Sequence, residues 1–142
     1  MRSRSLVILL AAVACDAGTD PNTVDVSGHW EFTETFQDAA HGITCADTGS
    51  YEITQVGDRF SGRYGQRGVC LTPSGAVDNA DSGTVTNGRV VGRTVRFMVT
   101  VNCDYEGNAS GMPPTSLGGR GACVLQDVGR TLNFAGTWQA TR

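Results

Sequence analysis

Hydrophobic and polar residues alternate with a period of two along most of the chain from Val26 to Ala140. No stretch of that region keeps a 3.6-residue apolar period for three helical turns. Alternation of this kind is typical of β-strands that bury one face and expose the other. The pattern therefore predicts an all-β domain over residues 26–142.

The first predicted strand shows the alternation clearly. Its two faces are Val26, Gly28, Trp30, Phe32 and Phe36 on one side, and Ser27, His29, Glu31, Thr33 and Thr35 on the other. The first face is expected to be core and the second wet. Glu31 and Glu34 fall on opposite faces, so they are not expected to act as a close acid–base pair.

Two hairpins align chemically matched residues. If Gly57-Asp58 forms a two-residue turn, the opposed pairs are Tyr51 with Tyr64, Glu52 with Arg63, and Cys45 with Cys70. A hairpin about Pro113-Pro114 opposes Cys103 with Cys123, Val101 with Leu125, Tyr105 with Gly121, and Glu106 with Arg120. These registers favour the disulfides Cys45–Cys70 and Cys103–Cys123, and a nested Cys70–Cys103 pairing is the alternative. Disulfides indicate an oxidising compartment.

Further turn signals complete a meander. Gly92-Arg93 and Val128-Gly129 read as turns, and Asn87-Gly88 reads as a β-bulge or another turn. The count is seven strands, or eight if the segment 81–91 splits. Because every connection joins neighbours, the strands are expected to form an antiparallel up-and-down sheet. Closing the first strand on the last removes both open edges, which favours a small barrel over a sandwich.

The inward face is rich in aromatic residues and glycines. The aromatic residues on it are Trp30, Phe32, Phe36, Tyr51, Phe60, Tyr64, Phe97, Tyr105, Phe134 and Trp138. The same face carries Gly62, Gly107, Gly119, Gly121 and Gly136. These glycines either bend the strands or leave open volume, so the pattern fits both a filled core and a cavity.

The start of the chain has the order of an export signal. Arginines at positions 2 and 4 precede an apolar run over 6–13, which is too short to span a bilayer, and small residues precede Cys15. Cys15 after Ala12-Val13-Ala14 resembles the lipobox of bacterial lipoproteins. The resemblance implies a signal peptide over 1–14, a lipidated Cys15 with a flexible tether over 15–25, and a lipid-anchored place in the bacterial cell envelope, facing the periplasm or the surface. Ordinary cleavage near Ala14 or Ala17 is the alternative.

Charge and motif content narrow the function classes. Without Arg2 and Arg4 the 11 basic residues become nine against 14 acidic residues, a formal charge of −5, which disfavours nucleic acid as a partner. Two histidines, His29 and His41, are too few and too separated for a zinc site, and 78–81 lacks EF-hand spacing. We expect no metal, no cofactor and no catalytic residue, because the four domain cysteines satisfy one another and no G-x-S-x-G elbow is present.

Short motifs resemble known barrel families. Val26-Ser-Gly28-His-Trp30 looks like the G-x-W start of lipocalins and the wider calycin group, and Gly136-Thr-Trp138 closes the domain in a similar way. Gly57-x-x-Phe60-x-Gly62-x-Tyr64 is similar to the second hairpin of avidins, where the tyrosine matching Tyr64 helps to bind the ureido group of biotin. The resemblance implies an eight-stranded barrel with one open end that binds a small molecule. Phe32 stands where avidins place a polar biotin ligand, which argues against biotin.

Two functional hypotheses follow from different classes. In the first, the barrel binds a small apolar or aromatic ligand near Trp30, Tyr51, Tyr64, Tyr105 and Trp138. In the second, a solid barrel contacts a protein partner of unknown identity through the loops 37–46, 72–80 and 108–117. The Ser-Gly-x-Trp opening also looks like that of small periplasmic barrel inhibitors of metalloproteases, which supports the second hypothesis. A passive envelope protein is the third reading.

Overall fold

Eight antiparallel β-strands make up the structure, a computed structural model that describes residues 22–99 and 102–142. The strands are β1 (Gly28–Asp38), β2 (Ile43–Val56), β3 (Arg59–Thr72), β4 (Gly75–Val91), β5 (Thr94–Val99), β6 (Cys103–Ser110), β7 (Ser116–Asp127) and β8 (Arg130–Thr141). The described residues contain no helix that is long and apolar enough to cross a membrane. The predicted signal peptide over 1–14 and Cys15 lie outside the described residues.

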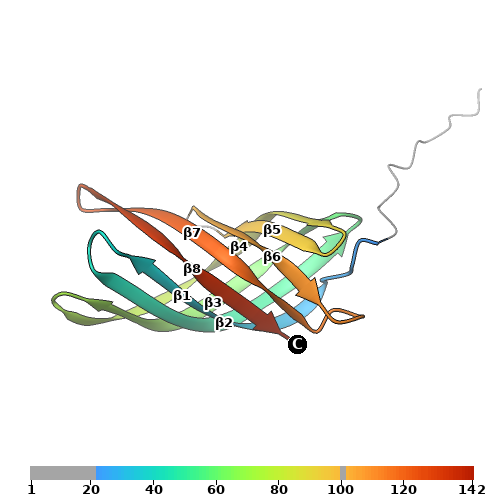
Figure 1. Ribbon diagram of the computed structural model, residues 1–142, viewed down its shortest axis with the longest axis horizontal. Coiled ribbons are helices and arrows are strands. Elements are labelled where there is room, and N and C mark those ends of the chain that lie inside the picture. The colour runs from blue at the N-terminus through green and yellow to red at the C-terminus, as the bar shows by residue number, and fades with distance from the viewer. Residues whose placement is uncertain (1–21, 100–101) are drawn as a thin grey trace, which may run out of the picture.

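The sheet closes on itself. Each strand pairs with the next along the chain, and β8 pairs back with β1, so that Phe36 lies opposite Gly136 and Phe32 opposite Ala140 (Figure 1). Closure leaves no open sheet edge. The predicted up-and-down barrel is confirmed, with eight strands, and it is the fold that the resemblance to lipocalins and avidins implies.

Both predicted hairpin registers are confirmed. Tyr51 lies opposite Tyr64 and Glu106 opposite Arg120, as the two turns require. Both predicted disulfides, Cys45–Cys70 and Cys103–Cys123, are present, which excludes the nested pairing. The expected partner of Leu125, Val101, lies outside the described residues.

The two glutamates expected to pair with arginines across the hairpins interact with other residues. Glu52 is opposite Arg63 in register, but its carboxylate accepts a hydrogen bond from His29 of the neighbouring strand β1. Glu106 forms its ion pair with Arg96 of β5 at 3.1 Å. An outward side chain in a barrel has neighbours on two sides, and a hairpin register names only one of them.

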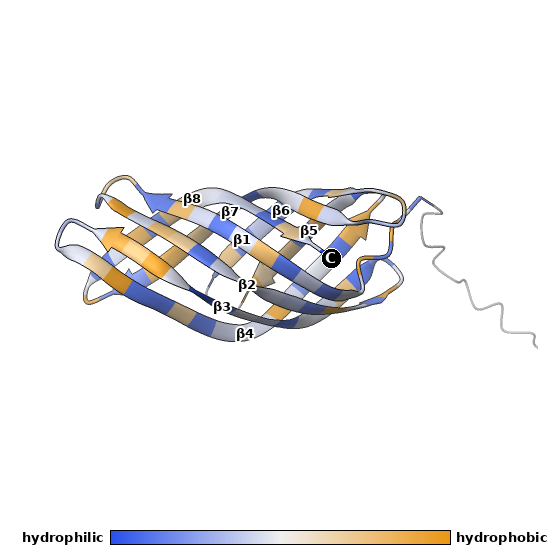
Figure 2. Ribbon diagram, turned by 90° about the horizontal axis from the view of Figure 1, so that it is seen from below, coloured by the Kyte–Doolittle hydropathy of each residue, from blue (hydrophilic) through white to orange (hydrophobic). Residues whose placement is uncertain are grey.

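Inward residues form one aromatic core. All ten aromatic side chains are buried, and hydrophobic and hydrophilic residues alternate along the strands (Figure 2). Phe32 stacks on Tyr51 with ring centroids 4.3 Å apart, and Phe97 stacks on Tyr105 at 4.9 Å. Trp138 packs edge-on against Phe97 at 5.3 Å. These contacts add to the burial of large apolar surfaces, so they fix the middle of the barrel.

The inward glycines allow close strand approach. A Cβ atom added to Gly136 would lie 1.9 Å from the Thr35 carbonyl oxygen, and one added to Gly62 would lie 2.0 Å from that of Glu52. No side chain fits at such distances. At these two positions glycine allows the strands to coil tightly. Of the two roles that the sequence allowed, bending the strands or leaving open volume, the first therefore applies here.

One expected loop is a strand. The segment 72–80 was predicted as a loop, but β3 runs to Thr72, β4 begins at Gly75, and pairing continues without a shift from Gly62 opposite Val85 to Thr72 opposite Gly75. The side chains of this segment are small and polar, so they lack the apolar alternation by which a strand is recognised in a sequence. The strand forms nonetheless, because the hydrogen bonds between strands use backbone groups alone. The other two expected loops shorten to residues 39–42 and 111–115.

The predicted bulge near Asn87-Gly88 is confirmed. The pairing of β4 with β5 shifts register between Thr86 and Arg89, and Asn87 has a φ of 53°. The segment 81–91 therefore stays one strand, and the eighth strand arises because β5 and β6 are separate strands that pair antiparallel with each other.

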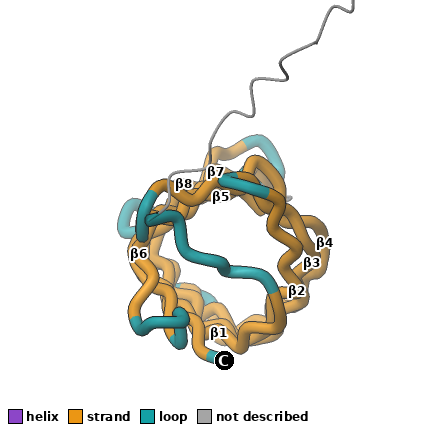
Figure 3. Tube along the Cα trace, turned by 90° about the vertical axis from the view of Figure 1, so that its right-hand side faces the viewer, coloured by secondary structure: helices purple, strands orange, loops and turns teal. Residues whose placement is uncertain are grey.

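A strap formed by residues 22–27 crosses one end of the barrel (Figure 3). The Gln55 side chain accepts a hydrogen bond from the Val26 amide at 2.8 Å and donates one to the Val24 carbonyl at 3.1 Å. Val26 is fully buried and its carbonyl accepts the Trp30 indole hydrogen bond at 2.8 Å. The Arg142 guanidinium lies 4.2 Å from the Trp30 ring centroid and donates to the Ser27 carbonyl at 2.7 Å. This end is therefore closed.

Replacing Gln55 with leucine should loosen the strap. The change removes both hydrogen bonds to the strap and a third to the Gly57 carbonyl, and it leaves the Val26 amide unpaired. We therefore expect the free energy of unfolding to fall by about 2 kcal/mol. Urea unfolding measures the loss, and amide hydrogen exchange at Val24 and Val26 locates it. Gln37→Leu, on the exposed face of β1, is the matched control. Unchanged exchange at Val26 in the Gln55 variant would contradict the strap's dependence on Gln55.

Candidate functional site

The open end of the barrel holds a cavity of about 780 Å³. Its mouth lies between the turns that join β1 to β2, β3 to β4 and β7 to β8, because His41, Pro73, Ser74, Asp127 and Arg130 line it. The strap covers the other end. The volume falls within the range of small-molecule sites, roughly 300–1,000 Å³. The interior is thus filled by aromatic side chains in one half and hollow in the other.

The walls of the cavity are mainly apolar. Both disulfides face it, together with aromatic and aliphatic side chains that come from most strands of the barrel. The apolar lining residues are Phe36, Ile43, Val77, Val99, Leu125, Leu132 and Phe134. Such walls can bury the apolar body of a ligand.

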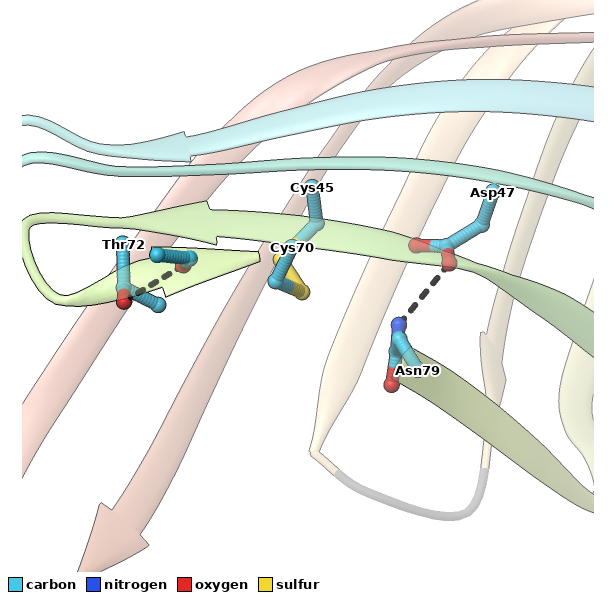
Figure 4. The surroundings of a disulfide bond; sticks show 6 residues. Cys45, Asp47, Cys70, Thr72 and Asn79 are labelled. Carbon is cyan, nitrogen blue, oxygen red and sulfur yellow. Dashed lines mark hydrogen bonds between the residues drawn. A yellow bond between two sulfur atoms is a disulfide. The ribbon is translucent and has the colours of Figure 1, made fainter. Parts of the chain in front are cut away.

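Carboxyl groups and tyrosines lie deeper, toward the aromatic core. The Tyr105 hydroxyl donates a hydrogen bond to Glu34 Oε2 at 3.0 Å, and the Tyr64 hydroxyl donates one to Asp81 Oδ2 at 2.5 Å. Near the Cys45–Cys70 disulfide, Asn79 Nδ2 donates to Asp47 Oδ1 at 2.9 Å (Figure 4). Glu34 and Asp47 are 6% and 4% exposed. The three carboxyl groups receive hydrogen bonds from neutral donors.

The basic groups at the rim are already paired. His41 Nδ1 lies 2.8 Å from Asp38 Oδ2, and the Arg130 guanidinium lies 3.0 Å from Asp127 Oδ2. The Asn133 backbone amide also donates to Asp38 at 3.0 Å. Burial opposes ionisation of Asp38, but these hydrogen bonds outweigh it and hold its pKa below the usual value. Each of these two basic side chains is therefore paired with its own aspartate.

Burial changes the acid–base behaviour of the inner groups. Desolvation raises the pKa of Glu34 to about 7, and the negative charge of Asp47 adds to the shift. Desolvation also raises the pKa of Asp47. The pKa of Tyr105 is raised by burial and by the charge of Glu34, so its phenol stays protonated and donates. The floor of the cavity therefore carries a carboxyl group, Glu34, whose pKa lies near neutral pH.

The Tyr51 hydroxyl is buried without a hydrogen-bond partner. Tyr51 is 1% exposed, and its ring is held by Phe32. Burial raises the pKa of its phenol, and the nearby Glu34 and Tyr64 raise it further. Tyr51 lies opposite Tyr64 in register, and Phe32, on which it stacks, is the inward neighbour of Glu34, so Tyr51 lies directly beneath the cavity floor that Glu34 and Tyr64 line. A buried hydroxyl without a partner costs free energy, which a ligand atom could recover.

The structure divides the ligand-binding residues predicted from the sequence. Tyr64 and Tyr105 line the cavity, whereas Trp30, Tyr51 and Trp138 lie in the packed core beneath it. Whether these five residues bind a ligand stays a prediction.

Sequence reasoning missed the inner carboxyl groups. Glu34 shares the inward parity of Phe32 and Phe36, and Asp47 follows Cys45 on the same face, so both were readable as inward residues. Asp81 shares the parity of the inward Val85 on the predicted strand 81–91, so it was readable in the same way. Among the described residues, no group of three or more His, Cys, Asp or Glu side chains is placed to hold a metal ion.

Comparisons with known proteins do not assign this chain to a family. No protein-family model and no curated protein matches the chain. A solved structure described as the siderocalin Ex-FABP, which functions through dual ligand specificities, is similar at 11% identity and a TM-score of 0.35, over 80% of this chain and 68% of that chain. A likeness of this degree assigns neither a family nor a ligand.

Glu34→Gln should change how stability depends on pH. Because the folded-state pKa of about 7 lies above the usual 4.5, the native protein keeps a proton that the unfolded chain releases. Stability from this group is present below pH 4.5 and is lost as the pH rises through 7. Relative to Glu34→Gln, the wild type should lose roughly 2 to 3 kcal/mol of unfolding free energy between about pH 5 and pH 8.

Urea unfolding at both pH values measures this difference. Glu106→Gln, which removes an exposed carboxylate paired with Arg96, is the matched control and should follow the wild type. If the unfolding free energies of the wild type and Glu34→Gln changed equally between the two pH values, Glu34 would be ionised in both the folded and the unfolded state.

Proposed function

We propose that this domain binds one small molecule, with an apolar or aromatic body, in the cavity at the open end of the barrel. The observation that carries the proposal is a cavity of about 780 Å³ with apolar walls and a few inward polar groups. Sites of this composition are typical of ligand-binding proteins. The solid core required by the loop-interaction hypothesis does not fit the hollow half of the barrel.

The chemistry favours binding over catalysis. Glu34, Asp47 and Asp81 are hydrogen-bonded to Tyr105, Asn79 and Tyr64, respectively. Neutral amide and phenol donors of this kind orient a carboxyl group, but they are not activated nucleophiles. We therefore propose a binding protein and not an enzyme.

Filling the cavity should abolish binding. Val77 lines the cavity from β4, and Val77→Trp would place an indole in its mouth. We expect the wild type to bind the neutral aromatic fluorophore N-phenyl-1-naphthylamine, and the variant to bind it at least tenfold more weakly, because the indole occupies the volume the probe needs. Fluorescence titration measures both affinities.

Val91→Trp is the matched control. Val91 lies on the same strand and is similarly exposed, 55% against 54% for Val77, but it faces outward. This variant should bind the probe as the wild type does. Equal binding by all three proteins would place the probe outside the barrel and count against the proposal.

The position of the domain in the cell is a proposal from the sequence alone. We propose that Cys15 carries a lipid that holds the domain at the bacterial cell envelope. Cys15→Ser should move the protein from the membrane fraction to the soluble fraction, and should remove the lipid mass from its first peptide. A membrane-bound Cys15→Ser protein would refute the anchor.

A further inference from the structure

The carboxyl groups inside the barrel have no basic partner in the described part of the chain. At the rim, His41 pairs with Asp38 and Arg130 pairs with Asp127, so neither basic side chain is available to the interior. No described Arg or His pairs with Glu34, Asp47 or Asp81. Buried carboxylates that lack a cation are costly, and they are relieved either by a proton or by a bound positive charge.

A second feature points to the same place and to a hydrogen-bonding ligand. The Tyr51 hydroxyl is buried without a partner. Tyr51 lies opposite Tyr64 in register and stacks on Phe32, the inward neighbour of Glu34 on β1. Its oxygen can accept a hydrogen bond that no described residue supplies. Glu34, Asp47 and Tyr51 thus present acceptors from two adjacent strands, β1 and β2.

We propose that the ligand is a primary amine, whose ammonium group binds to Glu34, Asp47 and the Tyr51 hydroxyl while its apolar body lies between Phe36, Phe134 and the disulfides. An ammonium group has three N–H donors and no acceptor, which matches a site made of carboxylates and a free hydroxyl oxygen. Hydrogen bonds between ionised groups are about twice as strong as neutral ones. This inference rests on the proposed function and names its ligand class.

The charge of the site follows from the groups that face Glu34. Asp47 and Tyr51 from β2 and Tyr105 from β6 act on Glu34, while Tyr64 from β3 and Asp81 from β4 line the same cavity. None of these groups is basic. A bound ammonium favours the ionised form of Glu34. Amine affinity should therefore rise as the pH increases from about 5.5 to 8, while the amine itself stays protonated.

The test uses ligands that differ only in the terminal group. Tryptamine, tryptophol and indole-3-acetate carry an ammonium, a hydroxyl and a carboxylate, and each competes with N-phenyl-1-naphthylamine on the full chain at about pH 8. We expect tryptamine to displace the probe at a concentration at least about tenfold lower than tryptophol does, and indole-3-acetate to displace it least.

Glu34→Gln removes the charge while keeping the size of the side chain. In this variant the advantage of tryptamine over tryptophol should fall to within about threefold, because a neutral amide replaces the carboxylate. Asp47→Asn should reduce the advantage in part, and Glu106→Gln, on the outer face, should leave it unchanged. Far-UV circular dichroism that matches the wild type shows that each variant is folded.

The outcomes separate the two proposals. If tryptamine and tryptophol compete equally in the wild type, the amine inference is wrong and the ligand-binding function stands. If the advantage of tryptamine survives both Glu34→Gln and Asp47→Asn, the ammonium site lies elsewhere and the inference is also wrong. If the probe itself does not bind in the barrel, both proposals fail.

Discussion

Hydrogen bonding between β1 and β8 closes the sheet, and the rest of the structure depends on that closure. In a closed barrel every second residue must enter a shared interior of fixed width. The inward residues of β1 therefore sample the whole length of that interior, from Trp30 beneath the strap, through Phe32 and Glu34, to Asp38 at the rim. One strand thus contributes to the closed end, the packed core, the cavity floor and the cavity mouth.

The two halves of the interior are stabilised in different ways. The strap half is filled by stacked and edge-on aromatic rings, which bury large apolar areas. The hollow half lacks that packing, and both disulfides lie in its wall. Each bridge closes a segment of 25 or 20 residues, which corresponds to about 3 kcal/mol in the chain-entropy model. The disulfides therefore lie in the half of the barrel where the cavity leaves fewer packing contacts between side chains.

Polar groups inside the barrel oppose stability and favour recognition. Glu34 and Asp47 are buried against neutral donors, and the Tyr51 hydroxyl has no partner at all. A domain selected for stability alone would carry apolar residues at these inward positions. Destabilised groups of this kind gather at functional sites, where a ligand supplies the missing interaction. The aromatic core beneath them holds their positions.

The sequence by itself predicted most of the strands, the two hairpin registers and the inward direction of all ten aromatic residues, and it favoured the disulfide pairing that the structure shows. These properties follow from period-two alternation and from turns that fix which residues face each other, so they are local. It left open whether the interior is filled, and it hid the start of β4, which was expected to be a loop. Only the tertiary structure decided that Tyr64 and Tyr105 border a cavity while Trp30, Tyr51 and Trp138 lie in the core. The reason is that open volume depends on which inward side chains, contributed by all eight strands, lie at the same height in the barrel. Only the closed barrel brings these side chains from distant parts of the chain together.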